Sequence, residues 1–161
     1  MRVEGGDGRR CSADVQAQAE TAQEERMRHE RPLIVLVDDD PAVVELLSDR
    51  FADTGYQTIG CLSTREAPSI IRREQPDLVV LDLQLERPDA SVTLLELLRR
   101  DPATQALPVI VCTADGWLLT RSAEQLHALG CAVVPKPVDP DGLLATVRAW
   151  LASSAAIAVG V

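Results

Sequence analysis

One short segment constrains the fold of this chain more than any other. It begins at Pro76 and Asp77, continues through four consecutive apolar residues, and ends on Asp82. Apolar runs without alternation are typical of strands that are buried on both faces, as in a parallel sheet. Asp82 would then stand at the carboxyl end of a central strand, where open α/β sheets bind their ligands. Taken alone, a turn role for Asp82 is the simpler interpretation, so the rest of the chain must decide between the two.

Composition limits the class of protein. The chain has 161 residues, enough for one domain, and its 46% hydrophobic content with 2% aromatics predicts a core of aliphatic side chains. The net charge of −9 disfavours direct binding to a nucleic-acid backbone, and the apolar runs are too short to span a bilayer. The four cysteines show neither CxxC nor metal-ligand spacing, so we expect reduced thiols and a cytoplasmic protein.

Strand-like and helix-like segments alternate five times along the chain. The strand-like segments are 33–37, 56–61, 77–82, 109–112 and 132–134. Helix-like segments follow each of them, and the sequences Asp40-Pro41 and Asp139-Pro140 are typical helix starts. Ser63 or Thr64 is expected to cap a short helix that reaches Glu74. Repeated short β-α-β units predict an α/β fold with a parallel sheet and helices on both of its faces.

Three regions are expected along the chain. Residues 1–31 lack a sustained apolar stripe and are predicted to be a disordered or frayed-helix extension. Residues 32–152 form the predicted domain, and residues 153–161 are expected to be a loose tail.

Polar residues of particular types follow four of the predicted strands. They are Asp38 and Asp39, Asp82, Thr113 and Lys136. In a parallel sheet these ends share one edge, and the acids converge if the first strand lies beside the third. Three carboxylates and one lysine leave a charge of −2, which Mg²⁺ with its preference for oxygen ligands would offset. A carboxylate held beside Mg²⁺ and a lysine can act as a nucleophile toward a phosphoryl donor.

Each of these residues also has a simpler interpretation when it is considered alone. Lys136 lies between two prolines and fits a solvated loop, and Thr113 fits a turn hydroxyl. Asp38 and Asp39 fit capping and solvation. It is their joint occurrence at the ends of successive strands that favours a common site.

Four segments, taken together, resemble the receiver domain of two-component response regulators. They are Leu36–Pro41, Asp77–Asp82, Pro108–Ala114 and Val134–Pro137, and the likeness covers about residues 32–152. The resemblance implies a (βα)5 flavodoxin-like, or CheY-like, three-layer fold with a five-stranded parallel sheet of order 2-1-3-4-5.

The resemblance also implies a role for each polar residue. Asp82 matches the phosphoacceptor, and Asp38 and Asp39 match the acids that hold Mg²⁺, with Asp39 the more direct ligand. The backbone carbonyl of Gln84 matches a further metal ligand. Thr113 and Lys136 match the hydroxyl and the ammonium that contact the phosphoryl group. The implied donor is a sensor histidine kinase or a phosphotransfer protein, and the implied readout is the face formed by helix 4, strand 5 and helix 5.

The chain departs from the family pattern at positions that concern the readout. Val133 stands where the family often has Tyr or Phe, and Glu86–Pro88 and Ala90 stand where Pro-Gly and Gly are frequent. An aromatic residue at position 133 would normally move inward together with the threonine, and valine cannot report that movement in the same way.

Three functions follow from these observations. The leading hypothesis is a single-domain response regulator, monomeric or weakly dimeric, that acts on a downstream protein and is not a turnover enzyme. The alternative is a receiver-like interaction module that works without phosphorylation, which Val133 favours. An aspartate-based phosphatase is disfavoured, because such enzymes usually need an acid two residues after the nucleophile and here that residue is Gln84.

Overall fold

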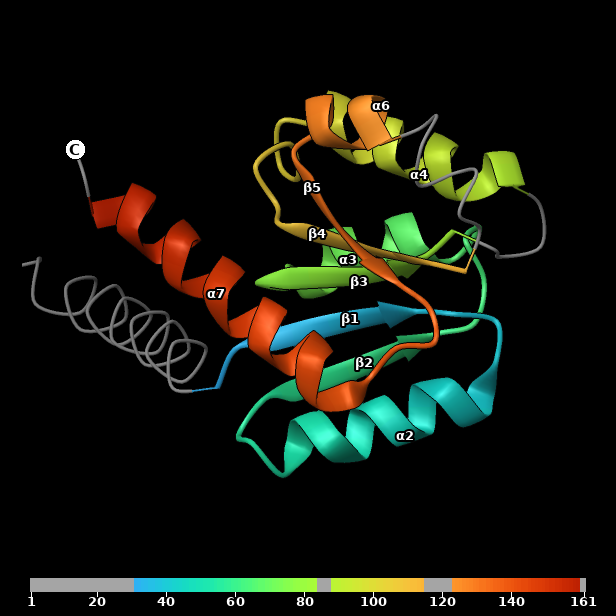
Figure 1. Ribbon diagram of the computed structural model, residues 1–161. Coiled ribbons are helices and arrows are strands. Elements are labelled where there is room, and N and C mark those ends of the chain that lie inside the picture. Colours follow the sequence, from blue (N-terminus) through green and yellow to red (C-terminus); the bar gives the residue numbers. More distant parts are fainter. Residues whose placement is uncertain (1–30, 84–87, 115–122, 160–161) are drawn as a thin grey trace, which may run out of the picture. The chain divides into compact units, whose positions relative to one another are not determined.

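Five parallel strands form the centre of the computed structural model (Figure 1), which describes residues 31–83, 88–114 and 123–159. The strands are β1 (Leu33–Val37), β2 (Gln57–Cys61), β3 (Leu78–Asp82), β4 (Val109–Thr113) and β5 (Cys131–Pro135). Their order is β2-β1-β3-β4-β5, and every neighbouring pair is parallel. The predicted fold class and strand order are therefore confirmed.

Helices cover both faces of the sheet. They are α2 (Pro41–Ala52), α3 (Ala67–Glu74), α4 (Pro88–Arg100), α6 (Ala123–Ala128) and α7 (Pro140–Val159). Because side chains alternate along β1, Ile34 and Leu36 pack with α2 and α7, whereas Val35 and Val37 pack with α3, α4 and α6. The sheet is thus the middle of three layers, and its central strands β1 and β3 are buried on both sides.

The two predicted Asp-Pro helix starts are confirmed. Asp40 Oδ1 accepts a hydrogen bond of 2.9 Å from Ala42 N, and Asp139 Oδ2 accepts one of 3.0 Å from Gly142 N. Each carboxylate satisfies a backbone N–H of the first helical turn, and the proline beside it needs no such partner. The helix α2 therefore begins directly after Asp38 and Asp39.

The predicted cap of α3 is wrong. The helix begins at Ala67, Glu66 occupies the capping position, and no side-chain cap bond is formed there. Ser63 Oγ instead accepts from Arg65 N at 3.2 Å, which stabilises a turn before the helix. Pro68 explains the late start, because its fixed φ and missing N–H suit only the first helical turn.

The last helix is longer than the sequence suggested. Helix α7 continues to Val159, through most of the segment expected to be a loose tail. Ala and Ser dominate residues 152–156, and alanine has the highest helix propensity of all residues. Of the predicted helix over 117–129, only the last part, α6, lies within the described residues. The expectation for residues 1–31 falls, except for Arg31, outside them.

A close contact fixes α2 on the edge of the sheet. A Cβ added to Gly60 of β2 would lie 2.5 Å from Val44 Cγ1 of α2, closer than real side chains approach. A side chain at position 60 would therefore force Val44 to move, and glycine lets this helix pack closely where it crosses the strand. None of the helices in the described ranges is long and apolar enough to cross a membrane.

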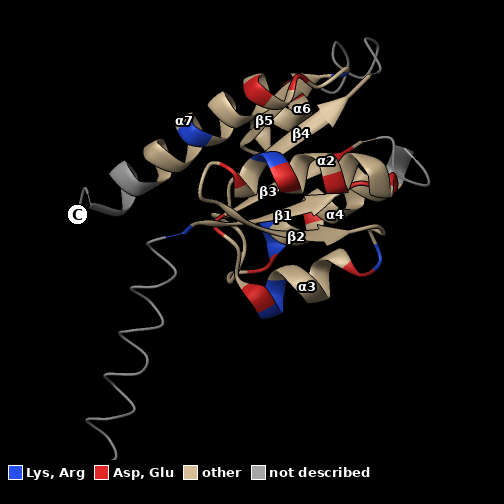
Figure 2. Cartoon of the chain, turned by 90° about the horizontal axis from the view of Figure 1, so that it is seen from below, with Lys and Arg blue, Asp and Glu red and all other residues tan. Residues whose placement is uncertain are grey.

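The helices on the outside carry charges of both signs. Figure 2 shows acidic and basic residues on α2 and again on α3. Several of them are paired, including Arg50 with Asp141 and Arg73 with Glu74. These two helices therefore present mixed charge rather than a field of one sign.

Candidate functional site

The three predicted acids lie together at the carboxyl edge of the sheet. Strand β1 lies beside β3, with Val37 opposite Leu81. Asp38 directly follows β1 and Asp82 is the last residue of β3, so the two acids lie at the same level of neighbouring strands. Asp38 and Asp82 are buried, whereas Asp39 is exposed. One carboxylate oxygen from each of the three residues lies within 4.8 Å of the others.

Lys136 faces two of these acids from the other side. Its Nζ lies 3.0 Å from Asp82 Oδ2 and 3.4 Å from Asp38 Oδ2, and its side chain is 21% exposed. The backbone places it there, because Lys136 N donates a hydrogen bond of 2.7 Å to the carbonyl of Thr113. The ammonium therefore bridges side chains from β1 and β3, although the residue itself follows β5.

Of the remaining two predicted residues, Thr113 and Gln84, only Thr113 lies within the described residues. Thr113 is fully buried at the end of β4, where it pairs in register with Pro135, one residue before Lys136. It therefore belongs to the same edge as the acids. The backbone carbonyl of Gln84, predicted as a metal ligand, lies outside the described residues.

Burial and charge act against each other at this edge. Burial raises the pKa of Asp38 and outweighs the hydrogen bond from Asp40 N (2.9 Å to Oδ1) and the charge of Lys136, which lower it. For Lys136, burial alone lowers the pKa, but the hydrogen bond to Asp82 and the charges of both acids together raise it above its usual value. The lysine is thus charged at neutral pH, and it brings one positive charge to a cluster of three acidic side chains.

The site is closed toward the protein interior. A cavity of only about 20 Å³ lies beneath the acids, between Val43 and Leu47 of α2 and Val80 and Cys112 of the sheet. That is room for no more than about one water molecule. Burial raises the pKa of the Cys112 thiol to about 12, so the thiol stays protonated at neutral pH. This cavity therefore has no room for a ligand larger than water.

The donor set fits a hard divalent cation. Three carboxylates offer oxygen ligands within 4.8 Å of one another, and with Lys136 they carry a net charge of −2. Mg²⁺ prefers a small number of carboxylates and completes its shell with water or phosphoryl oxygens. No histidine or thiolate lies among these ligand atoms, so the set does not suit a softer metal.

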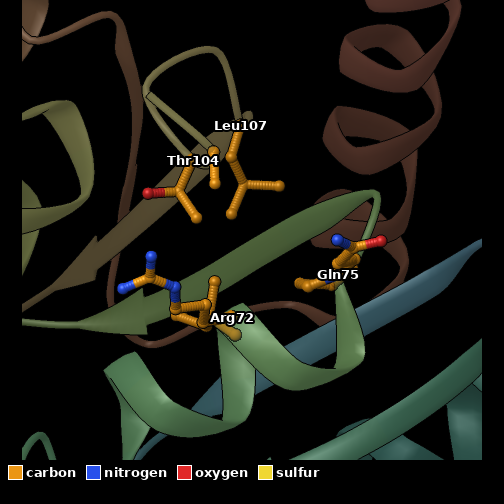
Figure 3. A pocket seen from close by; sticks show the side chains of 7 residues that line it. Arg72, Gln75, Thr104 and Leu107 are labelled. Carbon is orange, nitrogen blue, oxygen red and sulfur yellow. The ribbon is translucent and has the colours of Figure 1, made fainter. Parts of the chain in front are cut away.

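A larger cavity lies at the opposite edge of the sheet. It measures about 460 Å³ and is lined from α3 and from the segment that precedes β4. Figure 3 shows Arg72 and Gln75 on one side of it and Thr104 and Leu107 on the other. Because these residues precede β3 and β4 rather than follow them, this cavity has no part in the acidic site.

Fold and site together define a class of α/β protein: a CheY-like sandwich with an acidic cluster and a lysine at the carboxyl edge of its sheet. The chain belongs to the response regulator receiver domain family, whose family profile matches residues 34–148. Receiver domains of this family belong to two-component signalling systems, and this chain is therefore a protein of that class.

Individual relatives agree with this assignment. The chain is 33% identical over 120 residues to the "DNA-binding dual master transcriptional regulator RpaA" of Synechocystis, covering 74% of this chain. It spans about half (49%) of the length of that relative. It is also 29% identical to the "Polar-differentiation response regulator DivK" of Brucella ovis, over 73% of this chain and 94% of DivK.

Solved structures agree on the fold. The "Chemotaxis response regulator CheY4" of Vibrio cholerae superimposes with a TM-score of 0.65, over 73% of this chain and 97% of CheY4. The identity is 19%, so this comparison concerns the fold alone.

One residue beside the site was missed by sequence reasoning. Ser91 of α4 is fully buried, and its hydroxyl donates a hydrogen bond of 2.8 Å to the backbone carbonyl of Asp82. A signal was present, because Ser91 continues the inward stripe of Leu94, Leu95 and Leu98 at helical spacing. A polar residue on an otherwise apolar helix face must find a buried partner.

Proposed function

We propose that Asp82 accepts a phosphoryl group from a sensor histidine kinase or a phosphotransfer protein. One observation carries the proposal: the buried carboxylate of Asp82 lies 3.0 Å from Lys136 Nζ and within 4.8 Å of ligand oxygens of Asp38 and Asp39. A nucleophile, a cation and a metal-binding acid pair are thereby gathered at one edge of the sheet. Membership of the receiver domain family supports the same reaction.

The transfer is a substitution at phosphorus. An oxygen of Asp82 forms the new P–O bond, the P–N bond of the donor phosphohistidine breaks, and the leaving imidazole retains the electron pair and takes up a proton. Lys136, already in contact with Asp82 Oδ2, stabilises the negative oxygens of the group being transferred. By resemblance to the family, the Thr113 hydroxyl donates a hydrogen bond to one of these oxygens.

Asp38, Asp39 and Asp82 would hold Mg²⁺, with the carbonyl of Gln84 as a further ligand implied by the family. When bound, the ion supplies positive charge toward the phosphoryl oxygens and offsets the repulsion among the acids. Asp38 is well suited to this task, since its Oδ1 is fixed by Asp40 N and its Oδ2 lies toward Lys136.

Phosphorylation would act as a switch of conformation. The added charge favours one of two existing conformers, and a downstream protein reads the difference. The proposed output is a change in protein contacts made by a monomer or weak dimer, and the net charge of −9 disfavours direct binding to a nucleic-acid backbone. In this role the domain turns over no external substrate, and hydrolysis by water in time releases the phosphoryl group from Asp82.

One observation favours a second function. Val133 is half-buried in β5 and packs against the core beneath α3, α4 and α6. A branched aliphatic side chain in this position cannot report an inward movement as an aromatic ring would. A receiver-like module that binds its partner without phosphorylation is therefore the alternative.

Intact mass spectrometry distinguishes the two functions. The protein is incubated with Mg²⁺ and a small phosphodonor such as acetyl phosphate, and we expect a mass gain of one phosphoryl group. Asp82→Asn should abolish the gain. Asp40→Asn is the matched control, because the same chemical change lies beside the site and asparagine caps a helix as well as aspartate does. No gain in the wild type, or a gain that survives Asp82→Asn, contradicts the proposal.

A further inference from the structure

The Asp82 backbone is held by a side chain from a different element. Ser91, in the first turns of α4, donates its hydroxyl to the Asp82 carbonyl at 2.8 Å, and both residues are buried. Ser91 lies nine positions after Asp82, so the bond links the end of β3 to the first turn of α4.

The bond lies where two strands of the sheet stop pairing. The carbonyl of Cys112 in β4 accepts from Leu83 N at 2.9 Å, so the backbone groups of Asp82, one residue earlier, point toward β1. The last paired residues are Val37 of β1 and Leu81 of β3. Asp82 therefore stands where the pairing between β1 and β3 ends, and the Ser91 hydroxyl supplies a donor at that point.

We infer that Ser91 is a positioning residue for phosphoryl transfer to Asp82. The bond fixes the peptide plane that follows Asp82, and with it the direction of the Cα–Cβ bond that carries the carboxylate. In-line attack on phosphorus requires that direction, and a misplacement of about 1 Å can cost as much as 10²-fold in rate. The inference rests on the proposed function.

The experiment measures the rate constant of phosphorylation at saturating acetyl phosphate, together with Mg²⁺ affinity and unfolding in urea. For Ser91→Ala we expect a rate constant about tenfold lower. Mg²⁺ affinity should fall by a smaller factor than the rate constant, because Asp38 and Asp39, which follow β1, keep their positions and only the Asp82 ligand is disturbed. Ser91→Thr, which retains the hydroxyl, should recover most of the rate.

Thr104 provides the matched control. Its buried hydroxyl also donates to a backbone carbonyl, that of Leu98 at 2.9 Å, but it lines the cavity at the opposite edge of the sheet (Figure 3). Thr104→Val should lose stability as Ser91→Ala does and keep the wild-type rate. A general loosening of the domain would slow both variants equally, and that result overturns the inference.

Two further outcomes are decisive. If Ser91→Ala reacts at the wild-type rate while the wild type gains its phosphoryl group, the inference is wrong and the proposed function stands. If the wild type gains none, the proposed function itself fails. Should Ser91→Ala not fold, Ser91→Cys replaces the hydroxyl by a weaker donor of similar size; an unchanged rate there overturns the inference, and a reduced one supports it.

Discussion

Lys136→Met is the substitution whose cost can be worked out most directly from the geometry. The ammonium lies 3.0 Å from Asp82 Oδ2 and 3.4 Å from Asp38 Oδ2. At an effective dielectric constant of about 20, each contact is worth about 5 kcal/mol of gross Coulomb attraction. Desolvation of the three groups cancels much of this, and removing one partner of a buried pair typically costs about 3–5 kcal/mol. Since Lys136 retains 21% of its exposure, we expect about 3 kcal/mol.

Urea unfolding at pH 7 without divalent cations, followed by far-UV circular dichroism, measures this loss. For a domain of this size, about 3 kcal/mol lowers the melting temperature by roughly 10 °C. Added Mg²⁺ should restore part of the loss, because it offsets the charge that the lysine leaves behind. Arg50→Met is the control: Arg50 Nε donates to Asp141 Oδ1 at 2.8 Å, but both side chains are exposed and such pairs contribute little. Equal stability of the two variants would refute the reasoning.

Three other predictions concern the site and its support. Mg²⁺ at ten times its dissociation constant should stabilise the protein by about 1.4 kcal/mol, which raises the melting temperature by about 5 °C. Asp39→Asn should reduce this effect. A melting temperature that does not change with millimolar Mg²⁺ would contradict the prediction. Because the folded pKa of Lys136 is raised above 10.5, its stabilisation is complete below that pH and is lost as the pH rises through the folded value. Unfolding titrations should show a decline there that Lys136→Met lacks. Gly60→Ala should cost about 1–3 kcal/mol through its clash with Val44, and adding Val44→Ala should recover most of it in a double-mutant cycle; additive costs would refute the contact.

The sequence was sufficient for the architecture because its signals are local and repeated. Unbroken apolar runs mark β1, β3 and β4, and Asp40-Pro41 and Asp139-Pro140 mark the starts of α2 and α7. The strand order was inferred from family resemblance, since the apolar patterns alone do not say that β1 lies between β2 and β3. Once that order is known, the meeting of Asp38, Asp39 and Asp82 follows from the carboxyl edge they share.

What the sequence did not predict depends on contacts between distant elements or on competition between local signals. The bond from Ser91 to Asp82 requires the path of the connection between β3 and α4, which no local pattern specifies. The start of α3 was misplaced because Ser63 can stabilise a turn as readily as a helix cap, and Pro68 decided the outcome. The end of α7 was misplaced because its Ala and Ser residues carry no amphipathic pattern, although alanine favours a helix.

Locating the phosphoryl group on the chain tests the central claim most directly. After reaction with acetyl phosphate and Mg²⁺, borohydride reduction converts an aspartyl phosphate to homoserine, and peptide mass spectrometry identifies the converted residue. We predict conversion of Asp82, with none when the metal is chelated. Conversion at another aspartate, or equal labelling of Asp82 without Mg²⁺, would contradict the account.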